Sequence, residues 1–212
     1  MQLLLFFHLF FMPARQPPQP VWSAAELARA NTASDAAYLT AAEKKVILLV
    51  NLARLDGRKY LQTYFQQFNP IPYANMAGSG NAYLESLKKD MEAAKNLPML
   101  QPDEDLFKAA RYHARDTGKH GLVGHTSSDG TTFAKRLPRY VQGWKTMAEN
   151  CSYGYEDAVR IVGQLLLDQD VPSLGHRKSI LNPELEYIGV AIAPHSTYRF
   201  TCVMDFCAKF AD

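Results

Sequence analysis

Three side chains able to move protons or bind a metal ion lie within one stretch of the sequence, residues 147–193. Glu149 follows a short apolar lead in Ala-Glu-Asn, Asp168 ends an amphipathic segment, and His176 stands in a Gly-His-Arg turn. A fourth candidate, His125, lies upstream in the glycine-flanked loop GLVGHTSSDG. Two neutral imidazoles with one or two carboxylates suit a borderline ion such as zinc. Because their sequence separations are long, a shared site depends on the fold.

The same four groups allow other interpretations. His125, Glu149 and His176 could catalyse acid–base chemistry without metal, with a carboxylate fixing each histidine tautomer. Alternatively, the groups form a hydrogen-bonded polar cluster that joins a loop to a sheet. Asp168 could also have no role beyond ending its helix, although a carboxylate at the C-terminus of a helix is unfavourable. A Ser–His–acid hydrolase can be written from nearby serines, but none lies in a nucleophile-elbow motif.

Composition and charge limit the class of protein. The chain has 212 residues, 47% hydrophobic content and a net charge of +2, which suits one globular domain with a full core. The low net charge argues against nucleic acid as a main partner, and we expect no lysine or arginine cluster to form the stripe that phosphate binding needs. Beyond the first residues, no apolar run is long enough to span a bilayer.

The first residues resemble an export signal. Residues 1–12 are apolar and uncharged, with small residues at Ser23, Ala24 and Ala25, although no lysine or arginine precedes the apolar run. We therefore predict a signal peptide over residues 1–25 and a secreted or extracellular protein, with a buried N-terminal helix as the alternative. A linker or N-terminal extension over residues 26–39 and a single domain over residues 40–212 complete the prediction.

The sequence contains three cysteines, which cannot all pair with one another. Cys202 and Cys207 are separated by an odd number of residues, so they point to opposite faces of one strand. A disulfide between Cys151 and Cys202 is the better pairing for an exported chain. Three buried free thiols are the alternative.

Helices are expected early in the chain and strands late. Thr40-Ala-Ala-Glu43 is a capping box, and apolar residues then recur at helical spacing. Further helices are expected over 59–68, 81–96, 105–119 and 131–139 and after Glu156, with His113 as a satisfied core histidine. A strand over 147–151 and a hairpin of 187–193 with 198–206 follow. Without βαβ alternation, this order favours helices layered on an antiparallel sheet, an α+β fold.

Five segments in this order resemble the CAP superfamily of cysteine-rich secretory, antigen and pathogenesis-related proteins. They are LFKAARYHARD, GHTSSDGTTFAKRL, AENCSYG, GHRKSILNP and YIGVAI, and the bacterial or protist SCP-like type is the most similar form. The resemblance covers residues 40–209. It implies a three-layer α-β-α sandwich with a central antiparallel sheet flanked by helices.

The resemblance also implies a site. In the family, a cleft is lined by two histidines and two acids, which match His125, Glu149, His176 and Asp168, and in some members it binds a divalent metal such as zinc. The animal and plant members have glutamate where this chain has Asp168, and they carry disulfides that this chain lacks. The resemblance favours a secreted, monomeric binding module for a lipid, glycan or protein. A secreted peptidase-like hydrolase is the alternative, and no organic cofactor is expected.

Overall fold

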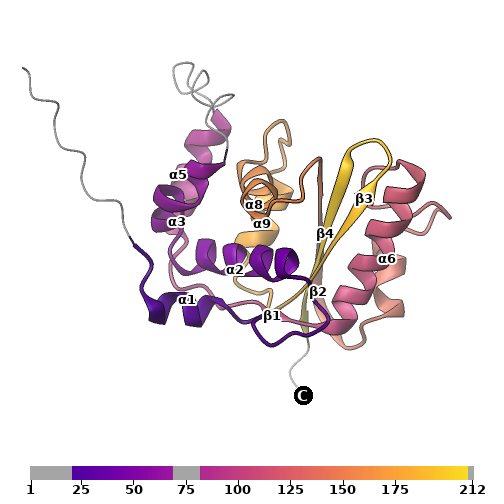
Figure 1. Ribbon diagram of the computed structural model, residues 1–212, viewed down its shortest axis with the longest axis horizontal. Coiled ribbons are helices and arrows are strands. Elements are labelled where there is room, and N and C mark those ends of the chain that lie inside the picture. Colours follow the sequence, from indigo (N-terminus) through magenta and orange to yellow (C-terminus); the bar gives the residue numbers. More distant parts are fainter. Residues whose placement is uncertain (1–20, 69–81, 210–212) are drawn as a thin grey trace, which may run out of the picture.

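The computed structural model describes residues 21–68 and 82–209. Their strands form one four-stranded sheet in the order β1 (Gln101–Pro102), β3 (Tyr187–His195), β4 (Arg199–Lys209), β2 (Trp144–Tyr153) (Figure 1). β3 and β4 form the expected hairpin, and β2 pairs antiparallel with β4. β1 lies between the helices predicted over 81–96 and 105–119, where no strand was expected, and it pairs in parallel with β3 at the edge of the sheet. The sheet is therefore antiparallel except at this edge.

Helices cover both faces of the sheet, which confirms the three-layer α+β prediction. Helix α6 (Glu104–His120) lies on one face, and α2 (Ala41–Leu55) and α8 (Ala158–Leu167) lie on the other (Figure 1). α6 approaches β3 so closely that a Cβ on Gly189 would lie 2.2 Å from the Leu106 carbonyl carbon. On the opposite face, the Ile192 backbone N–H donates to Glu43 of α2 over 3.0 Å.

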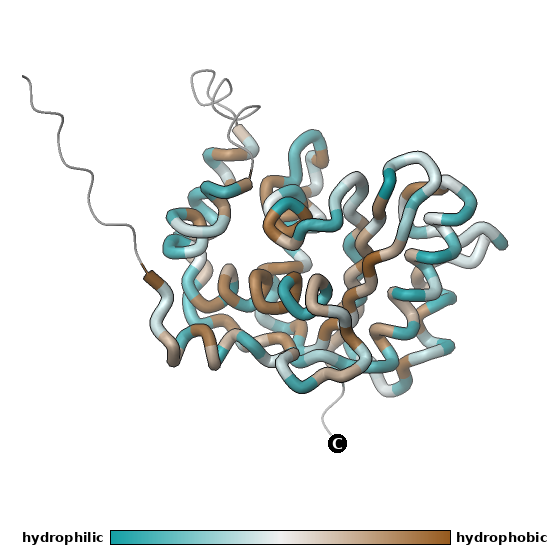
Figure 2. The backbone as a smooth tube through the Cα atoms, in the orientation of Figure 1, coloured by the Kyte–Doolittle hydropathy of each residue, from teal (hydrophilic) through white to brown (hydrophobic). Residues whose placement is uncertain are grey.

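The sequence explains where α2 begins and what it buries. Thr40 and Glu43 form the predicted capping box, in which each side chain accepts the other residue's backbone N–H. The apolar face that follows is fully buried against the sheet layer (Val46, Leu49, Val50, Ala53). Figure 2 shows hydrophobic residues recurring along α2 and α8. This burial stabilises the helices beyond their intrinsic propensity.

The remaining helices are shorter. They are α1 (Ala24–Ala30), α3 (Gly57–Thr63), the 3₁₀ turn η1 (Phe65–Gln67), α5 (Ala82–Ala93), α7 (Phe133–Arg136), the 3₁₀ turn η2 (Leu137–Arg139) and α9 (Gly175–Leu181). Two predictions need correction. The helix expected over 59–68 is α3 followed by η1, and the Gly-His-Arg segment is the first turn of α9.

The segment before α2 packs on the domain. Ser23 and Glu26 form a second capping box, which begins α1. The Trp22 indole N–H donates to Thr63 over 3.0 Å, and the Asn51 amide donates to the Ala30 carbonyl over 3.1 Å. Residues 26–39 therefore extend the domain core at its N-terminal side. The predicted signal peptide lies outside the described residues, apart from residues 21–25.

The three cysteines are buried free thiols, which confirms the free-thiol alternative and excludes the Cys151–Cys202 disulfide. Cys151 lies opposite Val203 in the β2–β4 ladder, and Cys202 lies opposite Ser152. The two thiols therefore project from opposite faces of the sheet. Every helix in residues 21–68 and 82–209 is too short or too polar to cross a bilayer.

Candidate functional site

Glu149 and His125 form the first of two histidine–carboxylate pairs. β2 places Glu149 on the face covered by α6, and the loop after α6 carries His125. Gly121 and Gly124, with φ of 67° and 93°, turn this loop back toward the sheet. His125 Nδ1–H donates to Glu149 Oε1 over 2.9 Å. The imidazole is 51% exposed and the carboxylate 1%, so a buried acid orients an accessible base.

A buried arginine holds the other oxygen of Glu149. Arg136, from α7, donates to Glu149 Oε2, and both side chains are 1% exposed. Its other terminal nitrogen donates to the His125 carbonyl over 3.2 Å and to Ser127 Oγ over 3.1 Å. Arg136 therefore joins the histidine loop to the carboxylate that its imidazole contacts.

Glu149 has a second acid beside it. Asp205 of β4 lies directly opposite Glu149 in the ladder and is fully buried. Burial opposes ionisation of Glu149, but the hydrogen bond from His125 and the charges of His113 and Arg136 outweigh it and lower its pKa. Burial, reinforced by the charge of Glu149, raises the pKa of Asp205 well above its usual range. Within this coupled pair, ionisation is therefore favoured at Glu149 and opposed at Asp205.

His176 and Asp168 form the second pair. His176 Nδ1–H donates to Asp168 Oδ1 over 2.6 Å, and the Arg177 backbone N–H donates to Asp168 Oδ2 over 3.1 Å. Asp168 ends α8 in the left-handed conformation, with φ of 55°, and its carboxylate lies at the start of α9. Leu174, the residue before α9, provides no side-chain cap. Asp168 therefore satisfies an N–H of the first turn of α9 while it orients His176.

The two histidines line one cleft of about 660 Å³. Glu149 also lines it, whereas Asp168 is 2% exposed and lies behind His176. The Asn150 amide donates to the His176 carbonyl over 3.0 Å, which fixes α9 against β2. The rest of the lining is mostly small and apolar (Thr126, Thr132, Phe133, Ala134, Met147, Ala148, Val171, Ser173, Gly175, Ser179).

The geometry gives the four predicted residues two different roles. Each carboxylate accepts from a histidine Nδ1, which selects the tautomer that keeps the Nε2 lone pair free. The Nε2 atoms of His125 and His176 are then the available metal ligands, and the carboxylates orient them from behind.

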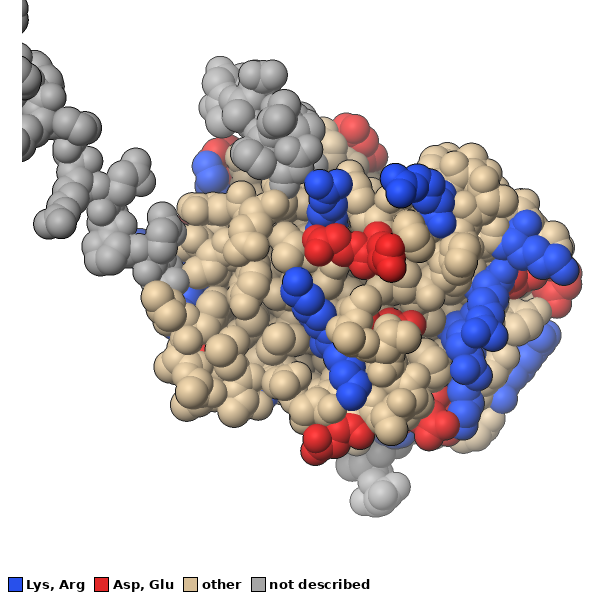
Figure 3. Space-filling model, viewed as in Figure 1, with Lys and Arg blue, Asp and Glu red and all other residues tan. Residues whose placement is uncertain are grey.

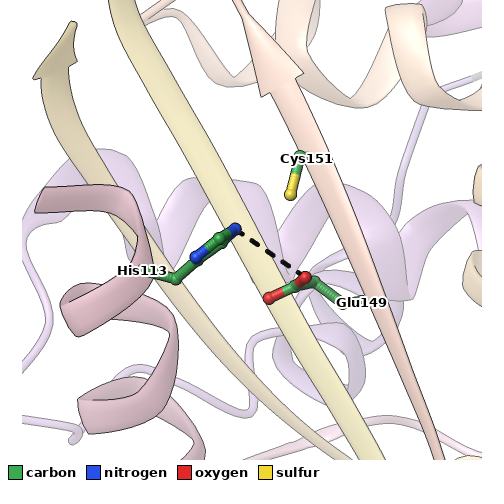
Figure 4. A group of neighbouring side chains, drawn as sticks. All are labelled: His113, Glu149 and Cys151. Carbon is green, nitrogen blue, oxygen red and sulfur yellow. Dashed lines mark ion pairs between the residues drawn. The ribbon is translucent and has the colours of Figure 1, made fainter. Parts of the chain in front are cut away.

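A second group of side chains whose types can bind a metal ion is buried and includes the cleft residue Glu149. One ligand atom from each of His113, Glu149 and Cys151 falls within 4.8 Å of the others, with His113 extending from α6 toward β2 (Figure 4). His113 Nε2 is 2.9 Å from the Gly124 carbonyl oxygen and so serves as a hydrogen-bond donor. Burial raises the pKa of Cys151 well above its usual value, which disfavours the thiolate that a metal requires. This set does not fit a metal, and His113 is the buried, hydrogen-bonded histidine that the sequence predicts.

Sequence reasoning missed Arg136 and Asp205. Asp205 had a usable signal, because it is a lone acid within the otherwise apolar strand sequence CVMDFC. Arg136 had none, because it stands between lysine and leucine in an ordinary amphipathic segment.

A family model described as the cysteine-rich secretory protein family, CAP, matches residues 48–206. The Bacillus subtilis protein YkwD is 30% identical over 96 residues, which are 45% of this chain and 35% of YkwD. The chain thus matches about a third of the length of that relative.

Two solved structures are also similar. An outer surface protein of Borrelia burgdorferi aligns with 25% identity and a TM-score of 0.47 over 61% of this chain and 90% of its own. An extracellular protein containing an SCP domain, from Bacillus anthracis, aligns with 28% identity and a TM-score of 0.45, over 54% of this chain and 35% of its own.

Proposed function

The chain belongs to the cysteine-rich secretory protein family, CAP, and from this premise we propose a secreted binding module whose cleft holds a divalent metal ion. The observation that carries the proposal is the matched pair of carboxylate-held imidazoles. His125 and His176 each bind a buried carboxylate through Nδ1, and both line the same cleft. Export is supported by the apolar segment over residues 1–12.

The residues fit zinc better than a hard cation. Imidazole nitrogen is a common zinc ligand, whereas calcium and magnesium prefer sets of oxygen ligands. Carboxylates that accept the Nδ1 proton of zinc-ligating histidines are the usual arrangement around such sites. Two protein nitrogens are fewer than the three ligands of zinc enzymes, so the remaining positions would be filled by water or by a partner.

Binding through this cleft follows from its shape and lining. When bound, the ion would supply Lewis-acid positions for oxygen or nitrogen donors of a lipid, glycan or protein. Phe133, Met147 and Val171 give the wall apolar surface, and the hydroxyls of Thr126 and Ser173 add polar contacts. A monomer suffices, because one chain supplies both histidines.

A hydrolase is the second candidate, and one observation favours it. An accessible imidazole with a buried carboxylate on Nδ1 is the base and orienting acid of a catalytic triad. Among the described residues, however, no serine or threonine hydroxyl lies within hydrogen-bond distance of the Nε2 of His125 or His176. The absence of such a hydroxyl disfavours a serine-type hydrolase, and assays with and without zinc test hydrolysis by a metal-bound water.

Zinc titration of the purified chain tests the proposal. We expect isothermal titration calorimetry to give one site per chain, lost in His125→Ala and in His176→Ala. His120→Ala is the matched control, because His120 is exposed on α6 and does not line the cleft. Equal zinc binding by the parent and both cleft variants would contradict the metal proposal.

A substrate panel separates the two candidates. The parent, His176→Ala and Glu149→Ala are assayed with short peptides and activated esters, with and without zinc. Binding alone predicts no turnover above the buffer rate in any of the three. Turnover by the parent that both substitutions abolish would establish the hydrolase.

A further inference from the structure

A row of basic side chains follows the exposed side of α6. Lys108, Arg111, Arg115 and Lys119 are all exposed and stand three or four residues apart, which places them on one helical face. The α6 basic stripe, as we call these four residues, extends over about 16 Å of helix axis. Figure 3 shows a band of basic side chains along the side of the molecule where Figure 1 places α6. The expectation that no basic stripe forms is therefore wrong, because the four residues are never adjacent in the sequence and only the helical spacing aligns them.

Most of the stripe is not neutralised by neighbouring acids. Lys108 has Asp105 at 2.9 Å and Glu104 at 3.5 Å. In residues 21–68 and 82–209, by contrast, Arg111, Arg115 and Lys119 form no ion pair.

One acid, Asp116, lines a groove together with the stripe and contributes a negative charge there. Asp116 accepts from the backbone N–H and the hydroxyl of Ser128, both over 2.6 Å. These hydrogen bonds hold Asp116 against Ser128 without removing its charge, and the three cations that form no ion pair, Arg111, Arg115 and Lys119, outnumber it three to one.

The stripe borders a groove that also contains aromatic rings. The groove measures about 590 Å³ and is lined by the stripe with Tyr112, Asp116, His120 and Tyr140. Tyr112 is 39% exposed, and its ring centroid lies 6.4 Å from that of Tyr140. The groove shares no lining residue with the histidine cleft. The groove thus combines the basic stripe with a neighbouring pair of tyrosine rings.

We propose that this groove binds a linear acidic polysaccharide. Such a chain carries anionic groups at intervals of one sugar, which matches cations placed one helical turn apart, and its sugar faces stack on tyrosine rings. A flat bilayer would contact the rim of a groove and leave the rings unused. A single-stranded nucleic acid carries phosphates that the same cations could bind, so it is included as a competing outcome of the test.

The binding experiment uses a fluorescein-labelled heparin octasaccharide and the full chain, followed by fluorescence anisotropy over a range of salt concentrations. We expect the triple variant Arg111→Ala, Arg115→Ala, Lys119→Ala to bind at least tenfold more weakly. Its slope of log affinity against log salt should be smaller by about two, because each lost contact removes roughly 0.7 to 0.9. The control is the triple variant Lys45→Ala, Arg58→Ala, Lys89→Ala, which removes the same charge from exposed residues of the opposite helical layer.

Further arms distinguish a polysaccharide from other polyanions. Tyr112→Ala keeps the charge, and we expect it to weaken octasaccharide binding about threefold or more. Unchanged affinity of the stripe variant, or an equal loss in the control variant, would overturn the proposal. Equal or tighter binding of single-stranded DNA or of phosphatidylserine vesicles, lost in the same stripe variant, would reject a polysaccharide as the partner. Circular dichroism spectra that match the parent show that each variant is folded.

Discussion

Arg136 is the residue through which the buried part of the site can be tested most directly. Arg136→Met keeps much of the side-chain volume but removes the guanidinium that contacts Glu149, Ser127 and the His125 carbonyl. The ionised Glu149 is then left in a buried site beside Asp205. We expect a large loss of stability, because an unpaired buried charge retains its desolvation cost.

The expected magnitude follows from the burial of both partners. Removing one partner of a buried ion pair typically costs about 3 to 5 kcal/mol. The double variant Arg136→Met, Glu149→Gln also removes the charge that was left behind. Its cost should therefore be smaller than the sum of the two single costs by about 2 kcal/mol.

Urea unfolding followed by circular dichroism at pH 7 measures these free energies. Lys88→Met serves as the control, because Lys88 pairs with Glu85 on the exposed surface of α5, where such pairs contribute less than about 1 kcal/mol. A cost below about 1 kcal/mol for Arg136→Met would refute the reasoning. Additive costs in the double variant would refute the pairing even if each single variant is unstable.

Three more outcomes are expected. In urea unfolding, the stability of Asp205→Asn relative to the parent should be higher at pH 8 than at pH 4. The pKa of Asp205 is raised in the folded protein, so folding favours its protonated form. In the parent, the stability that this provides is complete below the unfolded pKa of about 4 and is lost as the pH rises, whereas asparagine does not titrate. Asp168→Asn should weaken zinc binding about 10- to 100-fold in a chelator competition, because His176 loses its orienting carboxylate. Gly189→Ala should lower the melting temperature, at a cost of about 1 to 3 kcal/mol, because its Cβ would meet the Leu106 backbone at 2.2 Å.

Each of these outcomes has a clear contrary result. An unchanged pH dependence in Asp205→Asn would mean that Asp205 is ionised in the folded protein. Full zinc affinity in Asp168→Asn would mean that the Nδ1 bond does not orient the ligand. An unchanged melting temperature in Gly189→Ala would mean that α6 can move away from β3.

Local sequence patterns predicted the helices and strands in which apolar residues recur at regular spacing and are buried on one face. The capping box at Thr40 and the apolar rows after it located α2, and β-branched residues on either side of a turn located the β3–β4 hairpin. The same reasoning could have found α1, because Ser23-Ala-Ala-Glu26 repeats the capping-box pattern. Its weak apolar pattern favoured a linker instead.

What the sequence could not supply were contacts made by distant residues. The start of α9 has no capping side chain of its own, and its cap is Asp168, seven residues before Gly175. The choice between a Cys151–Cys202 disulfide and free thiols stayed open for a related reason, because a one-residue offset in the β2–β4 register sends the two thiols to opposite faces. The β2–β4 register depends on the packing of the whole sheet, so neither strand sequence determines it alone.

The place of β4 in the sheet has a consequence for folding. β4 is hydrogen-bonded to both β2 and β3, yet it follows both in the chain. β2 and β3 are not paired with each other, so a nascent chain that stops before residue 199 exposes two strand edges that await the same partner. Completion of the sheet must wait until residues 199–209 are synthesised, and the β2–β4 pairing closes a loop of about 50 residues. We therefore expect slow folding, with the chain most prone to aggregation before β4 becomes available.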